Sequence, residues 1–211
     1  MISTRTLSLI LIIVFVSFLG FVVENIFRVY SNGVIDNRNM VLPFLLGYGL
    51  AILMIYKLFG TPNAPLFFGK EIIVENTFVS VIYYFAIAFI GVSIGELILG
   101  HLIERTCDIV WWNYTALPLH ITKYTSIPTS FLFATMITVF MKYLFEPMLN
   151  VFSKIPQQTL SVLSITLIVI LSIDFIHSGI YMFKNHQILE MWRVDFEKSI
   201  KEIIINMKGS H

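Results

Sequence analysis

The residues of this chain that could do chemistry are carboxylates set inside long apolar stretches. Glu96, Gly100, Glu104 and Asp108 recur at steps of four residues, so they share one slowly rotating face of a predicted helix. A charged group in the hydrocarbon core costs about 2.5–3.5 kcal/mol on insertion scales, which makes Glu96 a functional candidate by default. The alternative is that Glu104 and Asp108 are solvated loop residues and that Glu96 alone is buried.

We expect Glu96 and Glu104 to face the interior of a helical bundle or a polar cavity. Arg38 and Arg105 are the predicted cationic neighbours of these two carboxylates. Glu24 lies near the end of the first apolar stretch. It is either part of the same polar site or a carboxylate at a helix end, solvated or paired with the arginine four residues on.

A polar stripe also interrupts the last apolar stretch, at Asp174, His177, Ser178 and Tyr181. An aspartate and a histidine at this spacing could relay a proton or supply two metal ligands, because a neutral imidazole binds metals. A hydrogen-bonded packing pair is the reading that we favour. No metal or other cofactor is therefore predicted, and Asp174 and His177 remain the candidates if one is bound.

The sequence lacks the common motifs of soluble enzymes. It contains no GxxxxGK[ST] phosphate-binding loop, GxSxG elbow, HExxH zinc helix or GxGxxG turn. The chain therefore does not hydrolyse ATP by a phosphate-loop mechanism, and an enzyme is the less favoured class. The 14 Lys and Arg residues are scattered and the net charge is +1, so we expect no nucleic-acid partner.

Composition places these residues in a membrane. Hydrophobic residues make up 57% of the chain and charged residues only 13%, against about 25% in soluble domains. About 20 apolar residues are needed to cross a bilayer as a helix. Five stretches qualify and predict an all-α integral membrane bundle of about five transmembrane helices. They run approximately over Thr6–Phe27, Met40–Phe59, Thr77–Ile103, Ser126–Phe145 and Thr159–Phe183.

Two features of the predicted helices concern their packing and their orientation. Gly91 and Gly95 form a small-xxx-small step that predicts close approach to a partner helix. Nine of the 14 Lys and Arg residues fall on the C-terminal side of a five-span arrangement. Positive residues favour the cytoplasmic side, so we expect an outside N-terminus and a cytoplasmic C-terminus in the plasma membrane.

Two segments outside the predicted spans have amphipathic character. Residues Glu104–Thr125 are rich in Trp and Tyr, which favour the membrane interface, so this segment is expected to lie at or dip into it. Apolar residues at three- and four-residue steps over Gln187–Met207 predict an amphipathic helix, which lies on the membrane surface or packs on the bundle's own loops. We therefore divide the chain into a transmembrane domain, residues 1–185, and a tail, residues 186–211.

The third apolar stretch and the segment after it also carry a family resemblance. They contain Glu96-x-x-x-Gly100-x-x-x-Glu104-Arg105 and then Trp111-Trp112-Asn113-Tyr114-Thr115. This pattern resembles the bacterial membrane family named Putative ABC-transporter type IV, or CmpB-like permease. The resemblance covers roughly residues 1–145 and includes Ser17-x-x-Gly20-x-x-x-Glu24, Asn37-Arg38 and Gly47-Tyr48-Gly49. The chain departs from the family pattern at Asn39, Asn113, Thr115 and His120, where the family has Gly, Asp, Ser and Asn.

The resemblance implies a permease that works with a separate ATP-binding subunit. Together with the carboxylates, it predicts a permease-like protein that binds or moves a small solute, ion or lipid headgroup between the first, third and fifth helices. The candidate binding residues are Glu24, Arg38, Glu96, Glu104, Arg105, Trp112, Asn113 and Tyr114. A membrane-embedded enzyme acting on lipid and a non-catalytic subunit that holds a partner are the alternatives, and a homo-oligomer is left open.

Overall fold

The computed structural model describes residues 2–196 of the 211-residue chain. The helices are α1 (Thr4–Asn32), α2 (Leu46–Phe59), α3 (Thr77–Cys107), α4 (Ile127–Val139), α5 (Phe145–Ser153) and α6 (Gln157–Asn185), with a π-helical turn, η1 (Phe140–Leu144), joining α4 to α5. The short strands of the described part are β1 (Val34–Asp36), β2 (Gly60–Thr61), β3 (Ala64–Phe67), β4 (Lys70–Glu71) and β5 (Arg193–Asp195). The predicted all-α membrane bundle is confirmed.

Helix boundaries follow from local capping groups. The side chains of Ser3, Asn76 and Ser126 accept backbone N–H groups at the starts of α1, α3 and α4. Such caps satisfy amides that have no partner within the helix. Gly33 ends α1 in the left-handed conformation (φ 66°), which glycine adopts without steric cost.

Four helical segments are long and apolar enough to cross a membrane: α1, α3, the continuous α4–α5 segment and α6. Helix α2 has only 14 residues and is about 21 Å long at 1.5 Å per residue, which is less than the roughly 30 Å of the hydrocarbon core. The prediction that this helix begins at Met40 is therefore wrong. The backbone N–H groups of Val41 and Leu42 instead donate to the carboxylate of Asp174 on α6, both at 2.9 Å, and Pro43 follows them.

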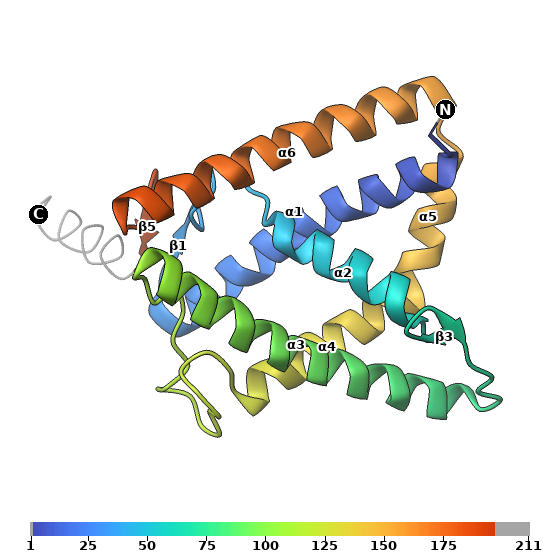
Figure 1. The fold of residues 1–211 in the computed structure, drawn as a ribbon, viewed down its shortest axis with the longest axis horizontal. Coiled ribbons are helices and arrows are strands. Elements are labelled where there is room, and N and C mark those ends of the chain that lie inside the picture. Colours follow the sequence, from blue (N-terminus) through green and yellow to red (C-terminus); the bar gives the residue numbers. More distant parts are fainter. Residues whose placement is uncertain (1, 197–211) are drawn as a thin grey trace, which may run out of the picture.

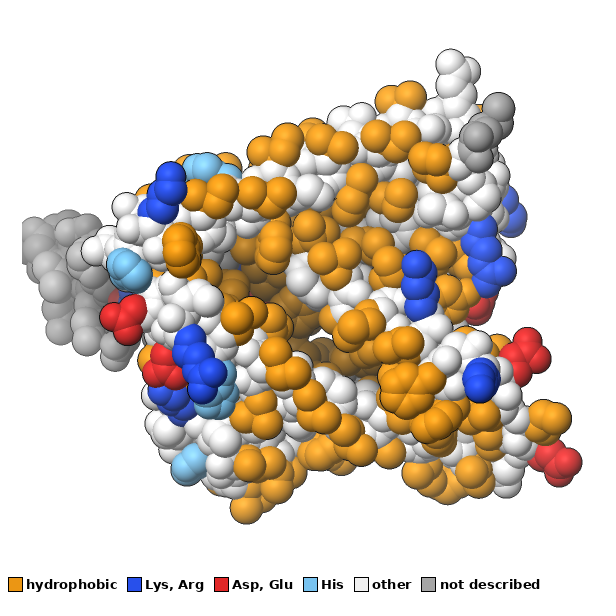
Figure 2. Space-filling model, in the orientation of Figure 1, with side chains coloured by type: hydrophobic (Ala, Val, Ile, Leu, Met, Phe, Trp, Pro, Cys, Tyr) orange, Lys and Arg blue, Asp and Glu red, His pale blue; other side chains and the backbone are white. Residues whose placement is uncertain are grey.

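Helices α1, α2, α3, the α4–α5 segment and α6 run in alternating directions between the two ends of the molecule, and α5 turns away from the line of α4 (Figure 1). The N-terminus and β3 lie at one end, and β1 and β5 lie at the other. Charged side chains visible on one face gather toward these two ends, with a largely hydrophobic band between them (Figure 2). A bundle that crosses a bilayer along this axis requires that distribution, because charge is costly in hydrocarbon.

Helix α1 is the central helix of the bundle. Of its most apolar window 56% is buried, against 17% for α3 and 22% for α6. The largest apolar cluster joins α1 to α2, α3 and α5 through side chains such as Ile12, Ile52, Tyr84 and Phe145. The outer faces of α3 and α6 are thus left for lipid or for other chains.

The predicted close approach at Gly91 and Gly95 is not made within the described part of the chain. Side chains added at these positions would meet no atom within 4 Å. Among the glycines within the described helices, the close contacts occur instead at Gly20 and Gly49, where α1 and α2 meet, and at Gly100 on α3.

The predicted tail helix is wrong over residues 187–195. Residues 187–192 are irregular, and β5 pairs antiparallel with β1, with Ile35 opposite Val194. Two asparagine side chains of the α1–α2 connection fix this path, since Asn37 Oδ1 accepts the N–H of Met191 and Asn39 Oδ1 accepts the N–H of Leu189. The rest of the predicted helix lies outside the described residues.

Candidate functional site

Glu24, near the C-terminal end of α1, accepts hydrogen bonds from two other parts of the chain. The hydroxyl of Tyr48 on α2 donates to Oε1, and Nη2 of Arg38, from the α1–α2 connection, lies 3.0 Å from Oε2. The ring of Tyr48 lies directly on Gly20, where an added Cβ would be 2.6 Å from the ring. Gly20, four residues before Glu24, therefore leaves room for the Tyr48 ring, whose hydroxyl donates to Glu24.

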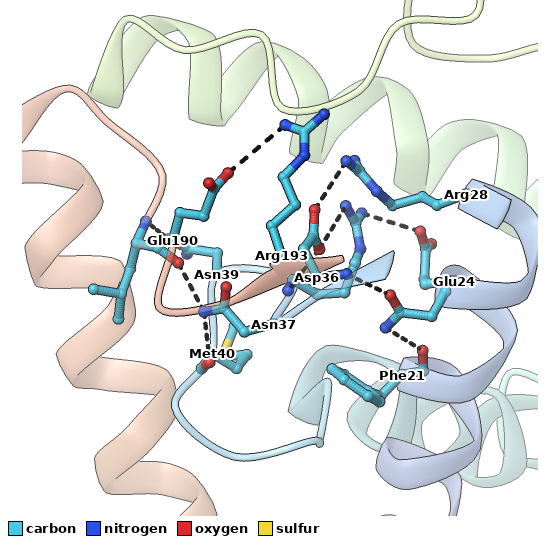
Figure 3. Close-up of polar contacts among 12 residues, drawn as sticks. Phe21, Glu24, Arg28, Asp36, Asn37, Asn39, Met40, Glu190 and Arg193 are labelled. Atoms are coloured by element: carbon cyan, nitrogen blue, oxygen red, sulfur yellow. Dashed lines mark hydrogen bonds and ion pairs between the residues drawn. The ribbon is translucent and has the colours of Figure 1, made fainter. Parts of the chain in front are cut away.

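Further ion pairs surround Arg38. Asp36 lies 2.8 Å from Arg28 and 4.0 Å from Arg38, and it also accepts the backbone N–H of Arg38 at 2.9 Å. These residues meet the C-terminal segment, residues 187–195, where Arg193 lies opposite Asp36 in the β1–β5 pair and 3.9 Å from Glu190 (Figure 3). Glu24 pairs with Arg38 and not with Arg28, whose partner is Asp36.

Glu96, the carboxylate within α3, has hydroxyl neighbours. Tyr114 Oη donates to its Oε1 at 3.3 Å and Ser130 Oγ of α4 to its Oε2 at 3.5 Å. The Tyr114 ring also packs edge-on against Phe27 of α1, with centroids 6.4 Å apart. Burial raises the pKa of Tyr114, and the charges of Glu96 and Glu24 raise it further. One phenol from the α3–α4 connection thus lies within electrostatic reach of both carboxylates.

Glu104 belongs to a separate site, two turns or about 12 Å along α3 from Glu96. It pairs with Lys123 and accepts the hydroxyl of Tyr124 at 2.7 Å. The prediction of Arg38 or Arg105 as its cationic neighbour is therefore wrong. The cation comes from the α3–α4 connection because Tyr124 is anchored over Gly100, where an added Cβ would lie 2.3 Å from the ring.

The other candidates on this part of the chain have local or surface positions. Trp112 Nε1 donates to the carbonyl of Tyr124 at 2.9 Å, which ties the two aromatic residues of the connection together. Asn113 is exposed and accepts the N–H of Thr115 at 2.9 Å in a local turn. Arg105 is exposed at the end of α3.

The Asp174 and His177 pair does not form a shared site. Both oxygens of Asp174 accept backbone N–H groups of the α1–α2 connection, and Ser178 Oγ donates to Oδ1 at 3.4 Å. His177 is exposed. Among the described residues, no group of three or more His, Cys, Asp and Glu is arranged to hold a metal ion. Asp174 thus fastens the α1–α2 connection to α6.

The structure therefore brings Glu24, Glu96 and Tyr114 together with Tyr48, which the choice of candidates missed. Gly47-Tyr48-Gly49 was a visible signal, because glycines on both sides of a tyrosine mark a close helix contact. A Cβ added at Gly49 would lie only 2.3 Å from the carbonyl oxygen of Ile13. Lys123 gave no such signal, since a lysine in an exposed loop is ordinary.

A family model described as Putative ABC-transporter type IV matches residues 11–179. The matched region runs from α1 into α6 and includes both carboxylate sites. Comparisons with curated proteins and with solved structures find no match.

Proposed function

This chain belongs to the Putative ABC-transporter type IV family, and from that premise we propose that it binds a small cationic solute or ion at Glu24 and Glu96 as the membrane-spanning part of a transport system. The family supports a membrane transport-related role in general. The solute class and the site are inferences from the contacts of the two carboxylates.

One observation carries the proposal: two carboxylates from different helices share the neighbourhood of Tyr114 within the bundle. Arg38 neutralises Glu24, whereas the hydrogen-bond partners found for Glu96 among the described residues are uncharged hydroxyls. The group thus holds one carboxylate more than its nearby cations. A half-buried carboxylate inside a membrane bundle is costly unless it is protonated or meets a cation, so a bound cation or ammonium group would complete the site.

The proposed site is bounded by α1, α2, α3 and α4. The sequence suggested that α6, the fifth predicted helix, would also border it, and we leave α6 out. Asp174 of α6 is occupied by the α1–α2 connection. Tyr114, by contrast, belongs to a connection between helices. A change in that connection would separate Tyr114 from Glu96 and release a ligand, which is the kind of movement that transport requires.

The first test is a thermal-shift screen of the purified chain in detergent. The probes are alkali and alkaline-earth cations, choline, ethanolamine and short polyamines, because a ligand stabilises the state that it binds. We expect at least one probe to raise the melting temperature of the parent and not of Glu96→Gln. Glu75→Gln, which changes an exposed carboxylate at the opposite end, is the matched control. If no probe separates Glu96→Gln from this control, the site is not the one proposed.

The second test is uptake of that probe into vesicles from cells expressing the parent or Glu96→Gln. Equal uptake in both would remove Glu96 from the transport path.

We propose in addition that a separate ATP-binding subunit drives uptake and that the C-terminal end is cytoplasmic in the plasma membrane. Affinity purification from native membranes tests the first point through an ATP-binding protein that is recovered with the chain. Labelling of cysteines introduced one at a time at Glu75 and Arg105, in a Cys107→Ser background and in intact cells, tests the second.

A further inference from the structure

A polar cavity of about 140 Å³ lies at the end of the bundle where α1 meets the C-terminal segment. Its wall is built from α1, both long connections and the segment after α6, and includes Arg28, Arg38, Trp111 and Arg193. The volume is well above the roughly 10–15 Å³ that one water molecule needs. A group of several heavy atoms therefore fits in it.

Three N–H groups in this wall are shielded from solvent and have no hydrogen-bond partner among the described residues. They are Nε of Arg28, Nε of Arg38 and Nε1 of Trp111. Buried donors without an acceptor are rare and costly in folded proteins. Each of these groups can only donate, so each would be satisfied by an acceptor atom brought within its reach.

The wall is rich in cationic hydrogen-bond donors. Three guanidinium groups line the cavity, those of Arg28, Arg38 and Arg193, together with the two carboxylates of Asp36 and Glu190. Glu24 pairs with Arg38 from outside the lining and balances the third cation, so the preference for an anion rests on the free donors and not on the net charge. The ion pairs that Arg28 and Arg38 make use terminal nitrogens, and these fix each guanidinium in place. The Nε atoms are thereby left for another ligand, and Arg38 is only 8% exposed.

We propose that this cavity binds a phosphate group. Arginine presents a planar set of donors that matches the oxygens of phosphate, and hydrogen bonds between charged partners are the strong ones. The tryptophan donor comes from the Trp-rich α3–α4 connection, a composition that favours the level of lipid headgroups. The phosphate comes either from a lipid headgroup or from a soluble phosphate compound. The cavity meets the proposed cation site at Arg38, which pairs with Glu24, whereas Glu96 does not line it.

The test uses the full-length chain in a phosphate-free maltoside detergent, with ¹⁵N in its three tryptophan indoles. Inorganic phosphate is titrated against sodium chloride at matched ionic strength. We expect the indole signal of Trp111 to move with phosphate and to saturate, because its N–H gains an acceptor. The signal of Trp112, whose N–H already donates to Tyr124, is the internal control and should stay in place.

Variants decide whether the effect belongs to the cavity. Arg28→Lys and Arg38→Lys keep the charge but remove the Nε donor, so each should weaken phosphate binding about tenfold. Arg105→Lys, at an exposed arginine, should leave it unchanged. If Arg38→Lys does not fold, as judged by the Trp112 signal, Arg28→Lys decides alone. Phosphate binding that Arg28→Lys leaves intact overturns the proposal.

Nanodiscs distinguish the two sources of phosphate. In nanodiscs of phosphatidylcholine with added phosphatidic acid, a lipid ligand should shift the Trp111 signal without any soluble phosphate. A soluble ligand should give the same signal in both lipids until inorganic phosphate is added. If Trp111 responds neither to phosphatidic acid nor to inorganic phosphate, the cavity is not a phosphate site. That outcome would leave the Glu96 thermal-shift test unaffected.

Discussion

The hairpins α1–α2 and α3–α4 use the same local arrangement of residues. In each, a glycine precedes a glutamate by four residues on the first helix, and a tyrosine ring lies on the glycine while its hydroxyl donates to the glutamate. In each, a cation from the connection pairs with that glutamate. The two sets are Gly20, Glu24, Arg38 and Tyr48, and Gly100, Glu104, Lys123 and Tyr124.

The two arrangements differ in burial. The side chains of Arg38 and Glu24 are 9% and 19% exposed, whereas those of Lys123 and Glu104 are 37% and 33% exposed. The first connection is covered because Asp174 of α6 and the C-terminal segment both bind its backbone or side chains. The same set of residues therefore forms an internal ion pair in one hairpin and a partly solvated one in the other.

The difference in burial suggests a structural role for the α1–α2 connection and a mobile role for the α3–α4 connection. A partly exposed pair is screened by salt and contributes little to stability, so the α3–α4 connection can move at low cost. That connection also carries Tyr114, which donates to Glu96. We infer that movement at the proposed site comes from the second hairpin and that the first hairpin is its fixed support.

The largest effect is expected from Arg38→Ala. Removing one partner of a buried ion pair leaves an uncompensated charge, which costs about 3–5 kcal/mol. Glu24 and Asp36 both lose a cation in this variant. Unfolding in mixed micelles, followed by circular dichroism, measures the loss. A change no larger than that of Lys123→Ala would show that the two hairpins are equivalent.

A smaller loss is expected from Gly20→Ala and Gly100→Ala. Each added methyl overlaps a tyrosine ring, and overpacking of this kind costs about 1–3 kcal/mol. Gly91→Ala and Gly95→Ala on α3 are matched controls, because open space surrounds both positions and alanine favours helix. Should the controls and the two variants lose equal stability in the same unfolding assay, the tyrosine contacts would not be the cause.

The spans were predictable because each is a long apolar run, whereas the start of α2 was not. Met40 to Leu45 is apolar, and Pro43 within it was a visible sign against a helix from Met40. The group that binds the N–H groups of Val41 and Leu42, Asp174, was not visible, because it lies more than a hundred residues away in the chain. The β1–β5 pairing was hidden for a similar reason. Its three-residue strands are too short to show alternation, and distant asparagine side chains hold β5 in place.

The carboxylates of the candidate site were predictable and their partners were not. Glu24 and Glu96 stand out because charge is rare in apolar runs. The sequence offered Arg38 or Arg105 as the cationic neighbours, but Arg38 pairs with Glu24, and Arg105, next to Glu104 on the helix, points away from it. Lys123 reaches Glu104 only because Tyr124 is seated on Gly100, a contact that depends on how the connection folds.

Lys123→Met should have a smaller effect than either glycine variant. The pair with Glu104 is partly exposed, and its contribution is screened by salt. We expect the difference in unfolding midpoint between parent and Lys123→Met to shrink as sodium chloride is raised. The Arg38→Ala difference should persist under the same conditions because its pair is buried. An equal salt dependence of the two differences would contradict the comparison.

The smallest effect concerns the alkaline side of the pH range. The hydrogen bond to Glu104 raises the pKa of Lys123 above 10.5, and burial raises the pKa of Tyr124 above 10.0. A group whose pKa is raised on folding contributes stability below its unfolded pKa and loses it as pH rises through the folded value. The α3–α4 connection should therefore loosen only above about pH 10. The indole ¹⁵N signal of Trp112, which is bonded to Tyr124, reports this loosening. Lys123→Arg should move the change to higher pH, because arginine remains protonated, and a midpoint that this variant leaves in place would assign the change to Tyr124 alone.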